Sequence, residues 1–113
     1  MASELGTIVR AMEFQDPWFA ATPKEQAGLE AEFALELPAG HVLARVPVTC
    51  LARCRDQDDV LFRLDDGTGR VALVHLTWKC GPEREPTFPH AVMYETAELW
   101  RAAMKADRAG SEG

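Results

Sequence analysis

The sequence predicts an α+β fold: a three- or four-stranded antiparallel β-meander packed against two main helices, with an additional amino-terminal segment. Before Pro38, apolar residues recur about every four positions, as on one face of a helix. From residue 46 they recur at every second position, as in a strand with one buried face. A length of 113 residues is typical of one domain, so we expect a single domain over 1–113.

The first helix is predicted over residues 23–37. Thr22 can act as N-cap, Pro23 fits the first helical position, and Glu25 completes a capping box. An apolar stripe follows at every fourth residue, formed by Leu29, Phe33 and Leu37. Proline and glycine at 38–40 then end the helix.

The sheet is predicted over residues 46–95. Its first strand would place one set of side chains on a single face, namely Val46, Val48, Cys50, Ala52 and Cys54. A glycine-containing hairpin loop at 65–69 joins the next two strands, but its length leaves their register open. In the third strand Val71, Leu73 and His75 share one face, and Ala72, Val74 and Leu76 share the other. Apolar residues on both faces indicate a strand that is covered on both sides.

The two ends of the chain differ in character. Residues 1–22 are too apolar for a solvated tail, so we expect an amino-terminal packing segment. Thr96 is a candidate N-cap for a carboxy-terminal helix over 97–108, whose apolar stripe contains Leu99, Trp100, Ala103 and Met104. Residues 109–113 are expected to fray.

Charge and composition favour a cytoplasmic location and disfavour nucleic acid as a partner. The net charge is −6, and residues 1–40 contribute most of it, with seven acids against Arg10 and Lys24. The amino terminus lacks the basic and apolar regions of a signal peptide, and no stretch is long enough to span a membrane. Three cysteines without a framework spacing suggest reduced thiols.

His75 is the strongest candidate for chemistry, because a histidine in a strand can transfer protons or bind a ligand. If the proline-rich loop folds back over the sheet, further polar residues could surround it and form a ligand site. These residues are Arg63, Thr77, Glu83, Glu85, His90 and Tyr94. A satisfied core histidine and surface salt bridges explain the same residues, since no nucleophile or orienting partner is evident.

We predict neither a metal site nor a cofactor. The available metal ligands are Cys50, Cys54, Cys80, His41, His75 and His90. Cys50 and Cys54 are four residues apart in a predicted strand, a separation of roughly 13 Å, which is too great for one ion. Core packing accounts for these two cysteines.

The large aromatic residues are expected mainly in the core. Trp18 and Phe19 are the exceptions, since an aromatic pair beside Pro17 in an irregular segment could anchor a partner or a second copy of the chain.

The segment from Asp59 to Phe62, the strand from Val71 to Trp78, and the proline-rich loop that reaches Phe88-Pro89-His90 and Tyr94 form a recognisable pattern. In this pattern the chain resembles a group of small bacterial proteins of unknown function, over about residues 38–105. The resemblance implies a shared fold and no particular site.

Two functions are compatible with these residues. The first is a non-catalytic protein-interaction or regulatory module, of the immunity type or self-associating, whose partner is another protein or a second copy. The second is a small enzyme or small-molecule binder with a polar pocket around His75.

Overall fold

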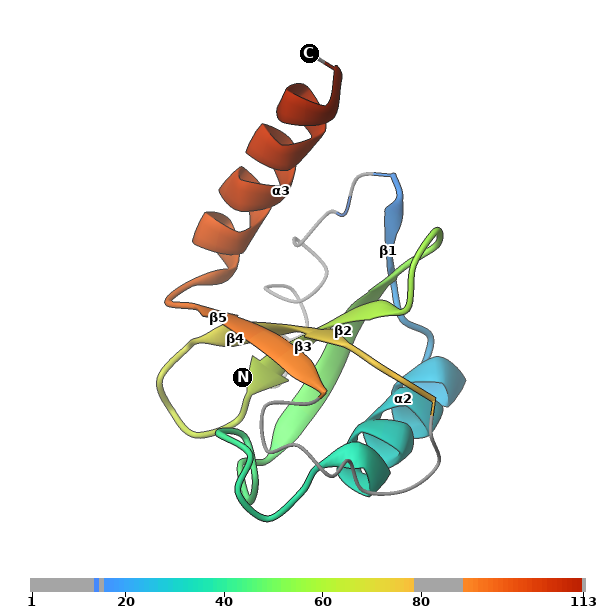
Figure 1. Ribbon diagram of the computed structural model, residues 1–113, viewed down its shortest axis with the longest axis vertical. Helices are drawn as coiled ribbons and strands as arrows, with labels where there is room; N and C mark the ends of the chain where they lie inside the picture. The colour runs from blue at the N-terminus through green and yellow to red at the C-terminus, as the bar shows by residue number, and fades with distance from the viewer. Residues whose placement is uncertain (1–13, 15, 79–88, 113) are drawn as a thin grey trace, which may run out of the picture.

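The computed structural model describes residues 14, 16–78 and 89–112, with side chains described as far as Ala106. It confirms an α+β fold with an antiparallel sheet (Figure 1). The elements are β1 (Trp18–Ala20), α2 (Pro23–Glu36), β2 (Val48–Cys54), β3 (Asp59–Leu64), β4 (Val71–His75), β5 (His90–Tyr94) and α3 (Ala97–Glu112). The strands lie side by side in the order of the sequence.

The sheet has five strands, so the predicted number of three or four was too small. The additional strand is β1, which lies in the segment expected only to pack. Trp18 pairs with Cys54, and Ala20 pairs with Ala52. Three residues are too few to show an alternating pattern, so this strand is defined by its partner β2 and could not be recognised locally.

Helix α2 begins as the sequence predicted. The Thr22 hydroxyl accepts a hydrogen bond from the Glu25 N–H at 3.2 Å, and the Glu25 carboxylate accepts one from the Thr22 N–H at 3.0 Å. This is the complete capping box, with Pro23 in the first turn. In α3, the Thr96 hydroxyl accepts from the Leu99 N–H at 3.1 Å, which confirms Thr96 as a capping residue.

Strand β2 does not present one face along its whole length. Its pairing with β3 is irregular between Cys50 and Ala52, because Cys50 lies opposite Phe62 whereas Ala52 already lies opposite Leu61. Leu51 is the additional residue of this β-bulge. As a result, Val48 and Cys50 pack on one side of the sheet and Ala52 and Cys54 on the other, so the single face expected for these residues was wrong.

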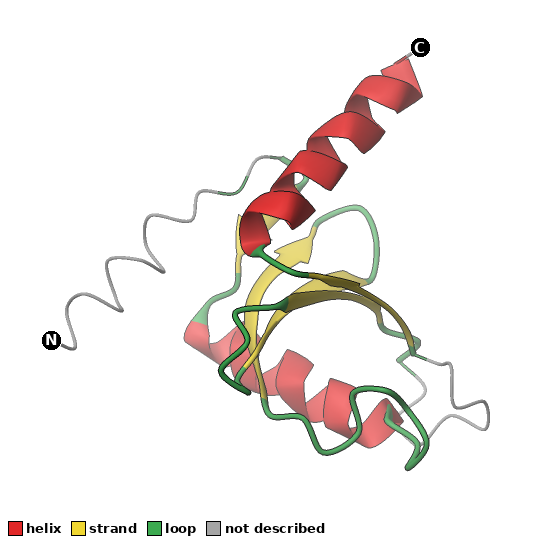
Figure 2. Cartoon of the chain, turned by 90° about the vertical axis from the view of Figure 1, so that its left-hand side faces the viewer, coloured by secondary structure: helices red, strands yellow, loops and turns green. Residues whose placement is uncertain are grey.

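The sheet is strongly curved (Figure 2). Two hydrophobic cores lie on its opposite faces. The α2-side core contains Leu29, Phe33, Leu43, Cys50, Val60, Phe62, Leu64, Ala72, Val74 and Leu76. The α3-side core contains Trp18, Leu51, Ala52, Cys54, Leu61, Val71 and Trp100. Leu73 packs against the second core, so β4 is covered on both faces with the alternation that the sequence predicted.

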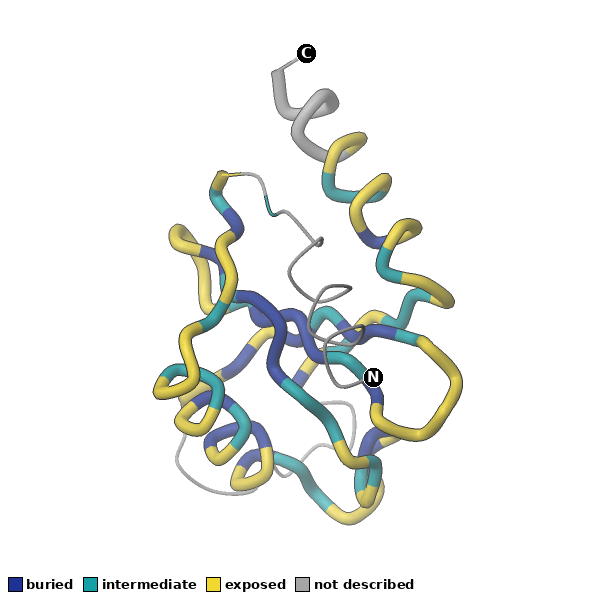
Figure 3. Tube along the Cα trace, turned by 180° about the vertical axis from the view of Figure 1, so that it is seen from behind, coloured by how far each residue is buried: buried dark blue, intermediate teal, exposed yellow. Residues whose placement is uncertain are grey.

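The two helices cover the sheet to different extents. Phe33 of α2 stacks on Phe62 with ring centroids 4.6 Å apart. Helix α3 contributes Trp100, which meets Trp18 edge-on at 5.0 Å. The described part of α3 is otherwise mainly exposed, and the helix projects beyond the sheet (Figure 3). Trp100 is therefore its principal buried attachment to the sheet.

The β3–β4 loop spans residues 65–69, and Leu64 donates a hydrogen bond to the Arg70 carbonyl at 3.0 Å across its base. Gly67 and Gly69 have positive φ values of 81° and 77°, which glycine adopts without steric cost. This loop sets the register, with Arg63 opposite Val71 and Asp59 opposite His75.

Candidate functional site

His75 lies at the end of β4 and makes a short contact with an acid. Its Nδ1 is 2.7 Å from Oδ1 of Asp59, the residue directly opposite it on β3. The His75 side chain is half exposed, and that of Asp59 is mainly covered. A carboxylate that fixes one ring nitrogen leaves the other available to an incoming group, which is the usual orientation of a proton-transferring histidine.

His90 lies beside this pair. It is the first residue of β5 and is the register partner of His75, so both side chains lie on the same face of the sheet. Asp59, His75 and His90 thus form a row across β3, β4 and β5 at one end of the sheet. The sequence could not show this row, because it depends on two strand registers.

The structure places other residues of the predicted site elsewhere. Arg63 lies opposite Val71, four positions from His75 along the strand and roughly 13 Å away. Tyr94 is also a partner of Val71 and packs at the α3-side core. Arg63 instead bonds Asp65 at 2.9 Å. These two side chains therefore lie at the opposite end of the sheet from His75.

Thr77, Glu83 and Glu85 complete the predicted set. The N–H of Thr77 donates to the Glu36 carboxylate at 2.9 Å, on the α2 side of the molecule. Glu83 and Glu85 lie outside the described residues. Among the described residues, only His90 of the predicted set is a direct strand neighbour of His75.

The aromatic pair predicted as an interface is divided between core and surface. Trp18 is only 8% exposed and belongs to the α3-side core. Phe19 is 37% exposed, and the guanidinium of Arg53 lies 5.5 Å from its ring centroid. Trp18 is thus engaged within the chain, and Phe19 is the member that reaches the surface.

A buried acid pair on α2 was not identified from the sequence. Glu36 is fully buried, and its carboxylate accepts hydrogen bonds from the N–H groups of Thr77 at 2.9 Å and Trp78 at 2.8 Å. Burial raises the pKa of Glu36, and a hydrogen bond with the Glu32 side chain raises it further. The available signal was the spacing of four residues, which puts both acids on one side of the helix, near Phe33.

His41 is buried and structurally satisfied. Its Nε2 is 2.7 Å from the Pro89 carbonyl, and its Nδ1 accepts from the Leu43 N–H at 2.9 Å. The ring therefore fastens the residue before β5 to the segment that follows α2. This histidine holds the start of β5 in place and has no nitrogen left for a ligand.

The cysteines Cys50 and Cys54 are free and buried on opposite faces of the sheet. Burial raises the pKa of the Cys50 thiol to about 12, and the nearby negative charges of Glu30 and Glu25 act in the same direction. Cys80 lies outside the described residues. Within the described ranges, no group of three or more His, Cys, Asp or Glu side chains is arranged to hold a metal ion.

Strand β5 forms one edge of the sheet, and no described strand pairs with its outer side. Its sequence, His-Ala-Val-Met-Tyr, contains no lysine, acid or proline, and its pairing with β4 is regular. Val92, at its centre, is 39% exposed. Edges are usually protected by charges, prolines or bulges, so β5 is unusually open to another strand.

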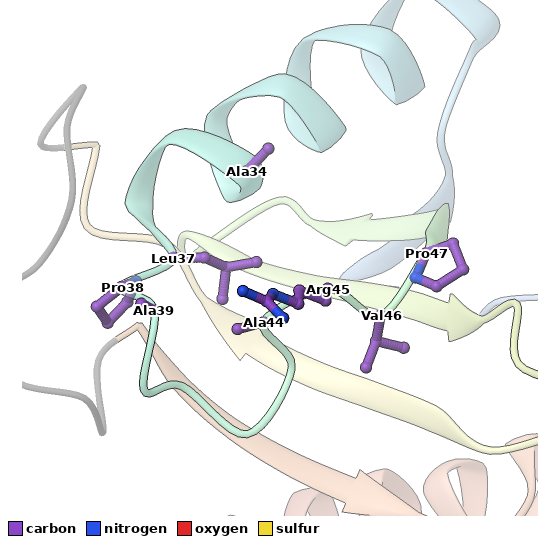
Figure 4. Close-up of a pocket in the computed structure, with 8 residues that line it drawn as sticks. All are labelled: Ala34, Leu37, Pro38, Ala39, Ala44, Arg45, Val46 and Pro47. Atoms are coloured by element: carbon purple, nitrogen blue, oxygen red, sulfur yellow. The ribbon is translucent and has the colours of Figure 1, made fainter.

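A second surface feature is an open pocket of about 520 Å³ between the end of α2 and the segment before β2 (Figure 4). It is lined by Ala34, Leu37, Pro38, Ala39, Ala44, Arg45, Val46 and Pro47. Arg45 is the only charged residue in this lining.

Comparison with known proteins adds no assignment, since no family model, curated protein or solved structure matches the chain. None of the helices in the described part of the chain combines the length and apolar character needed to cross a bilayer.

Proposed function

We propose that this protein is a non-catalytic interaction module that pairs with a second copy of itself through β5. The observation that carries this proposal is the open, uncharged edge of that strand with the exposed Val92 at its centre. An exposed edge of this kind is a template for another strand, because its outward backbone groups need partners.

The ladder indicates which backbone groups face outward. At one end of the β3–β4 ladder the Leu76 N–H donates to the Asp58 carbonyl at 2.9 Å, and at the other end the Leu64 N–H donates to the Arg70 carbonyl at 3.0 Å. The backbone groups at even-numbered positions of β4 therefore bond to β3. In an antiparallel ladder the odd-numbered positions must then bond to β5. Their partners there are His90, Val92 and Tyr94. The N–H and C=O groups of Ala91 and Met93 consequently point away from the sheet.

An antiparallel pair centred on Val92 satisfies these groups. Ala91 of one copy then lies opposite Met93 of the other and exchanges two hydrogen bonds with it, and the symmetric pair exchanges two more. The two Val92 side chains meet on the α3-side face, because Val92 is the register partner of Leu73. No like charges oppose each other in this arrangement.

The opposite edge is less suited to pairing. Strand β1 has three residues, lies next to Pro17, and its Phe19 side chain already contacts Arg53. Short edge strands give few hydrogen bonds to a partner. Pairing through β5 would also form one continuous sheet from the two copies. Its two-fold axis is perpendicular to the sheet, so both α2 helices lie on the same side.

The mass in solution tests the proposal. Sedimentation equilibrium of the full chain over micromolar to millimolar concentrations is expected to show a species of twice the 12.5 kDa chain mass. Val92→Lys should abolish this species, because two ammonium groups would lie directly opposite each other. Val92→Thr, which is β-branched and uncharged, should retain it. A monomer at all concentrations, or a dimer that Val92→Lys leaves intact, would refute the proposal.

Cross-linking tests the register. Val92→Cys in a Cys80→Ser background is expected to form a disulfide-linked dimer under mild oxidation, because facing residues in a non-hydrogen-bonded pair have Cβ atoms about 4.5–5.5 Å apart. Leu99→Cys, at an exposed apolar position on α3, is the matched control and should not cross-link at the same rate. Equal rates would contradict pairing about Val92.

A second candidate function is proton transfer by His75, supported by the 2.7 Å contact of its Nδ1 with Asp59. Hydrolysis of p-nitrophenyl acetate probes such an imidazole without a known substrate. We expect His75→Ala to lower the rate more than His90→Ala, and Asp59→Asn to lower it partly, because the carboxylate orients the ring. Equal rates for wild type and His75→Ala would exclude this candidate.

A further inference from the structure

We infer that the pocket around Arg45 is a binding site for a small carboxylate anion with an aliphatic chain. The geometry that points to this ligand is a guanidinium without a partner among the described residues, in the lining of an otherwise uncharged, mainly aliphatic pocket of about 520 Å³ (Figure 4). This site is independent of pairing through β5, since none of the lining residues belongs to that strand.

Arg45 differs from the other arginines of the central segment. Each of the other arginines that the structure describes between residues 41 and 78 forms an ion pair with an acid: Arg53 with Glu25, Arg55 with Asp16, Arg63 with Asp65 and Arg70 with Asp66. Arg45 forms no ion pair or hydrogen bond with any residue in the described ranges. In a chain with 18 acids and a net charge of −6, this guanidinium remains available to an external anion.

The backbone at Arg45 adopts a conformation that arginine disfavours. Its φ is 68°, in the left-handed region that glycine and asparagine occupy at less cost. Strained positions of this kind concentrate at binding sites, where the side chain itself is needed. The hydrogen bonds from Ala44 N–H to His41 and from Val46 N–H to Leu43, at 3.0 and 3.1 Å, hold the turn on either side of Arg45.

A structural role at the end of α2 would be the alternative use of the guanidinium. The last turn of α2 contains no basic residue, so a nearby cation would be favourable there. However, no hydrogen bond joins the Arg45 side chain to a carbonyl of the described part of that turn. The end of the helix is instead closed by the Leu37 N–H, which donates to the Phe33 carbonyl at 3.2 Å.

The walls of the pocket define the rest of the ligand. Figure 4 shows the Arg45 side chain lying beside Leu37 and Ala44, with Val46 and Pro47 continuing the surface. Among the lining residues, no side chain other than that of Arg45 offers a hydrogen-bond donor or acceptor. A carboxylate can form two parallel bonds with the guanidinium, and an aliphatic chain can cover the apolar wall.

The test is a titration of the isotopically labelled full chain with hexanoate, followed by amide chemical shifts. We expect saturable shifts at the amides of Ala39, Arg45 and Val46. Acetate, which lacks the chain, and hexan-1-ol, which lacks the charge, should each bind about tenfold more weakly, a loss of about 1.4 kcal/mol. Inorganic phosphate should also bind weakly, because it leaves the apolar wall uncovered.

Three variants make the test specific. Arg45→Gln should remove the hexanoate shifts, whereas Arg101→Gln, the same charge change at an exposed position of α3, should leave them unchanged. Ala34→Glu should also suppress binding, because a carboxylate at this exposed helix position can pair with Arg45. Unchanged binding in Arg45→Gln, acetate binding as tight as hexanoate binding, or no saturable shift with hexanoate would each overturn the inference.

Discussion

Glu36 shows how strongly one residue can depend on its surroundings. Its carboxylate is removed from water and held by two backbone N–H groups at 2.8 and 2.9 Å. Trp78, one of the two donors, has a positive φ of 57°, so a strained backbone turn accompanies the acid. The end of β4 is thereby fastened to the last turn of α2 through a single side chain.

Replacement of Glu36 should therefore destabilise the fold. Glu36→Ala leaves two N–H groups without their acceptor, and we expect a loss of about 2–4 kcal/mol in the free energy of unfolding. Urea denaturation followed by circular dichroism measures this loss. Glu98→Ala, at an exposed position of α3, is the control and should change stability little. Similar losses for both variants would show that the buried hydrogen bonds contribute nothing.

The pH dependence of stability follows from the raised pKa of Glu36. The folded chain retains this proton more tightly than the unfolded chain, whose carboxyl titrates near 4.5. This tighter proton binding stabilises the folded state fully below pH 4.5, and the stabilisation is lost as pH rises through the pKa of Glu36 in the folded chain. As pH rises above 4.5, Glu36→Gln should therefore lose less stability than wild type, because its side chain stays neutral. Parallel curves for the two proteins would contradict this prediction.

Among the helices and strands, those that were predicted correctly can be recognised from residues that are close together in the sequence. The capping box of α2 lies within four consecutive residues, and both Thr22 hydrogen bonds are present. Strand β1 and the bulge at Leu51 carry no such signal. Each exists because of a residue distant in sequence: Trp18 pairs with Cys54, and the bulge depends on the register with β3.

The candidate site was only partly predictable for the same reason. His75 was identified from its residue type and its strand, but its partner Asp59 depends on the register across the 65–69 loop. A loop of two to four residues would have placed other side chains opposite His75. Arg63 was grouped with His75 in one polar pocket, with its face left open, but the register separates the two residues along the strands.

The cap of α2 should be measurable by itself. Thr22→Ala removes the acceptor of the Glu25 N–H, and we expect a loss of about 1 kcal/mol in the free energy of unfolding. Thr22→Ser retains a hydroxyl and should restore most of that stability. Denaturation curves of the three proteins check this order. A Thr22→Ser variant as unstable as Thr22→Ala would show that the hydroxyl is not the stabilising group.

At the scale of the whole molecule, the sheet separates two cores of different composition. The α2-side core is mainly aliphatic around the Phe33–Phe62 stack, whereas the α3-side core centres on Trp18 and Trp100. Phe14 also contacts Trp100 edge-on, at 5.9 Å. One indole therefore joins the amino-terminal part of the chain, the sheet and the last helix.

Trp100 should accordingly control the attachment of α3. Trp100→Ala removes both ring contacts, and we expect a loss of about 3–5 kcal/mol in the free energy of unfolding. Trp100→Phe should cost clearly less, because the Trp100 Nε1 is buried without a partner among the described residues and its removal is favourable. Urea denaturation ranks the variants. Equal losses of unfolding free energy in Trp100→Ala and Trp100→Phe would mean that the aromatic contacts do not hold α3 on the sheet.

The bulge at Leu51 reverses which face of the sheet the alternating side chains of β2 point to. Val48 and Cys50, before the bulge, pack in the α2-side core, and Ala52 and Cys54, after it, pack in the α3-side core. Deleting Leu51 would remove this register shift while leaving the amino-acid composition almost unchanged. Arg53, which now reaches Glu25 on the α2 side, would be turned toward Trp18 and Trp100, or else β1 would lose its register with β2. A single-residue deletion should therefore be far more damaging here than any substitution at the same position.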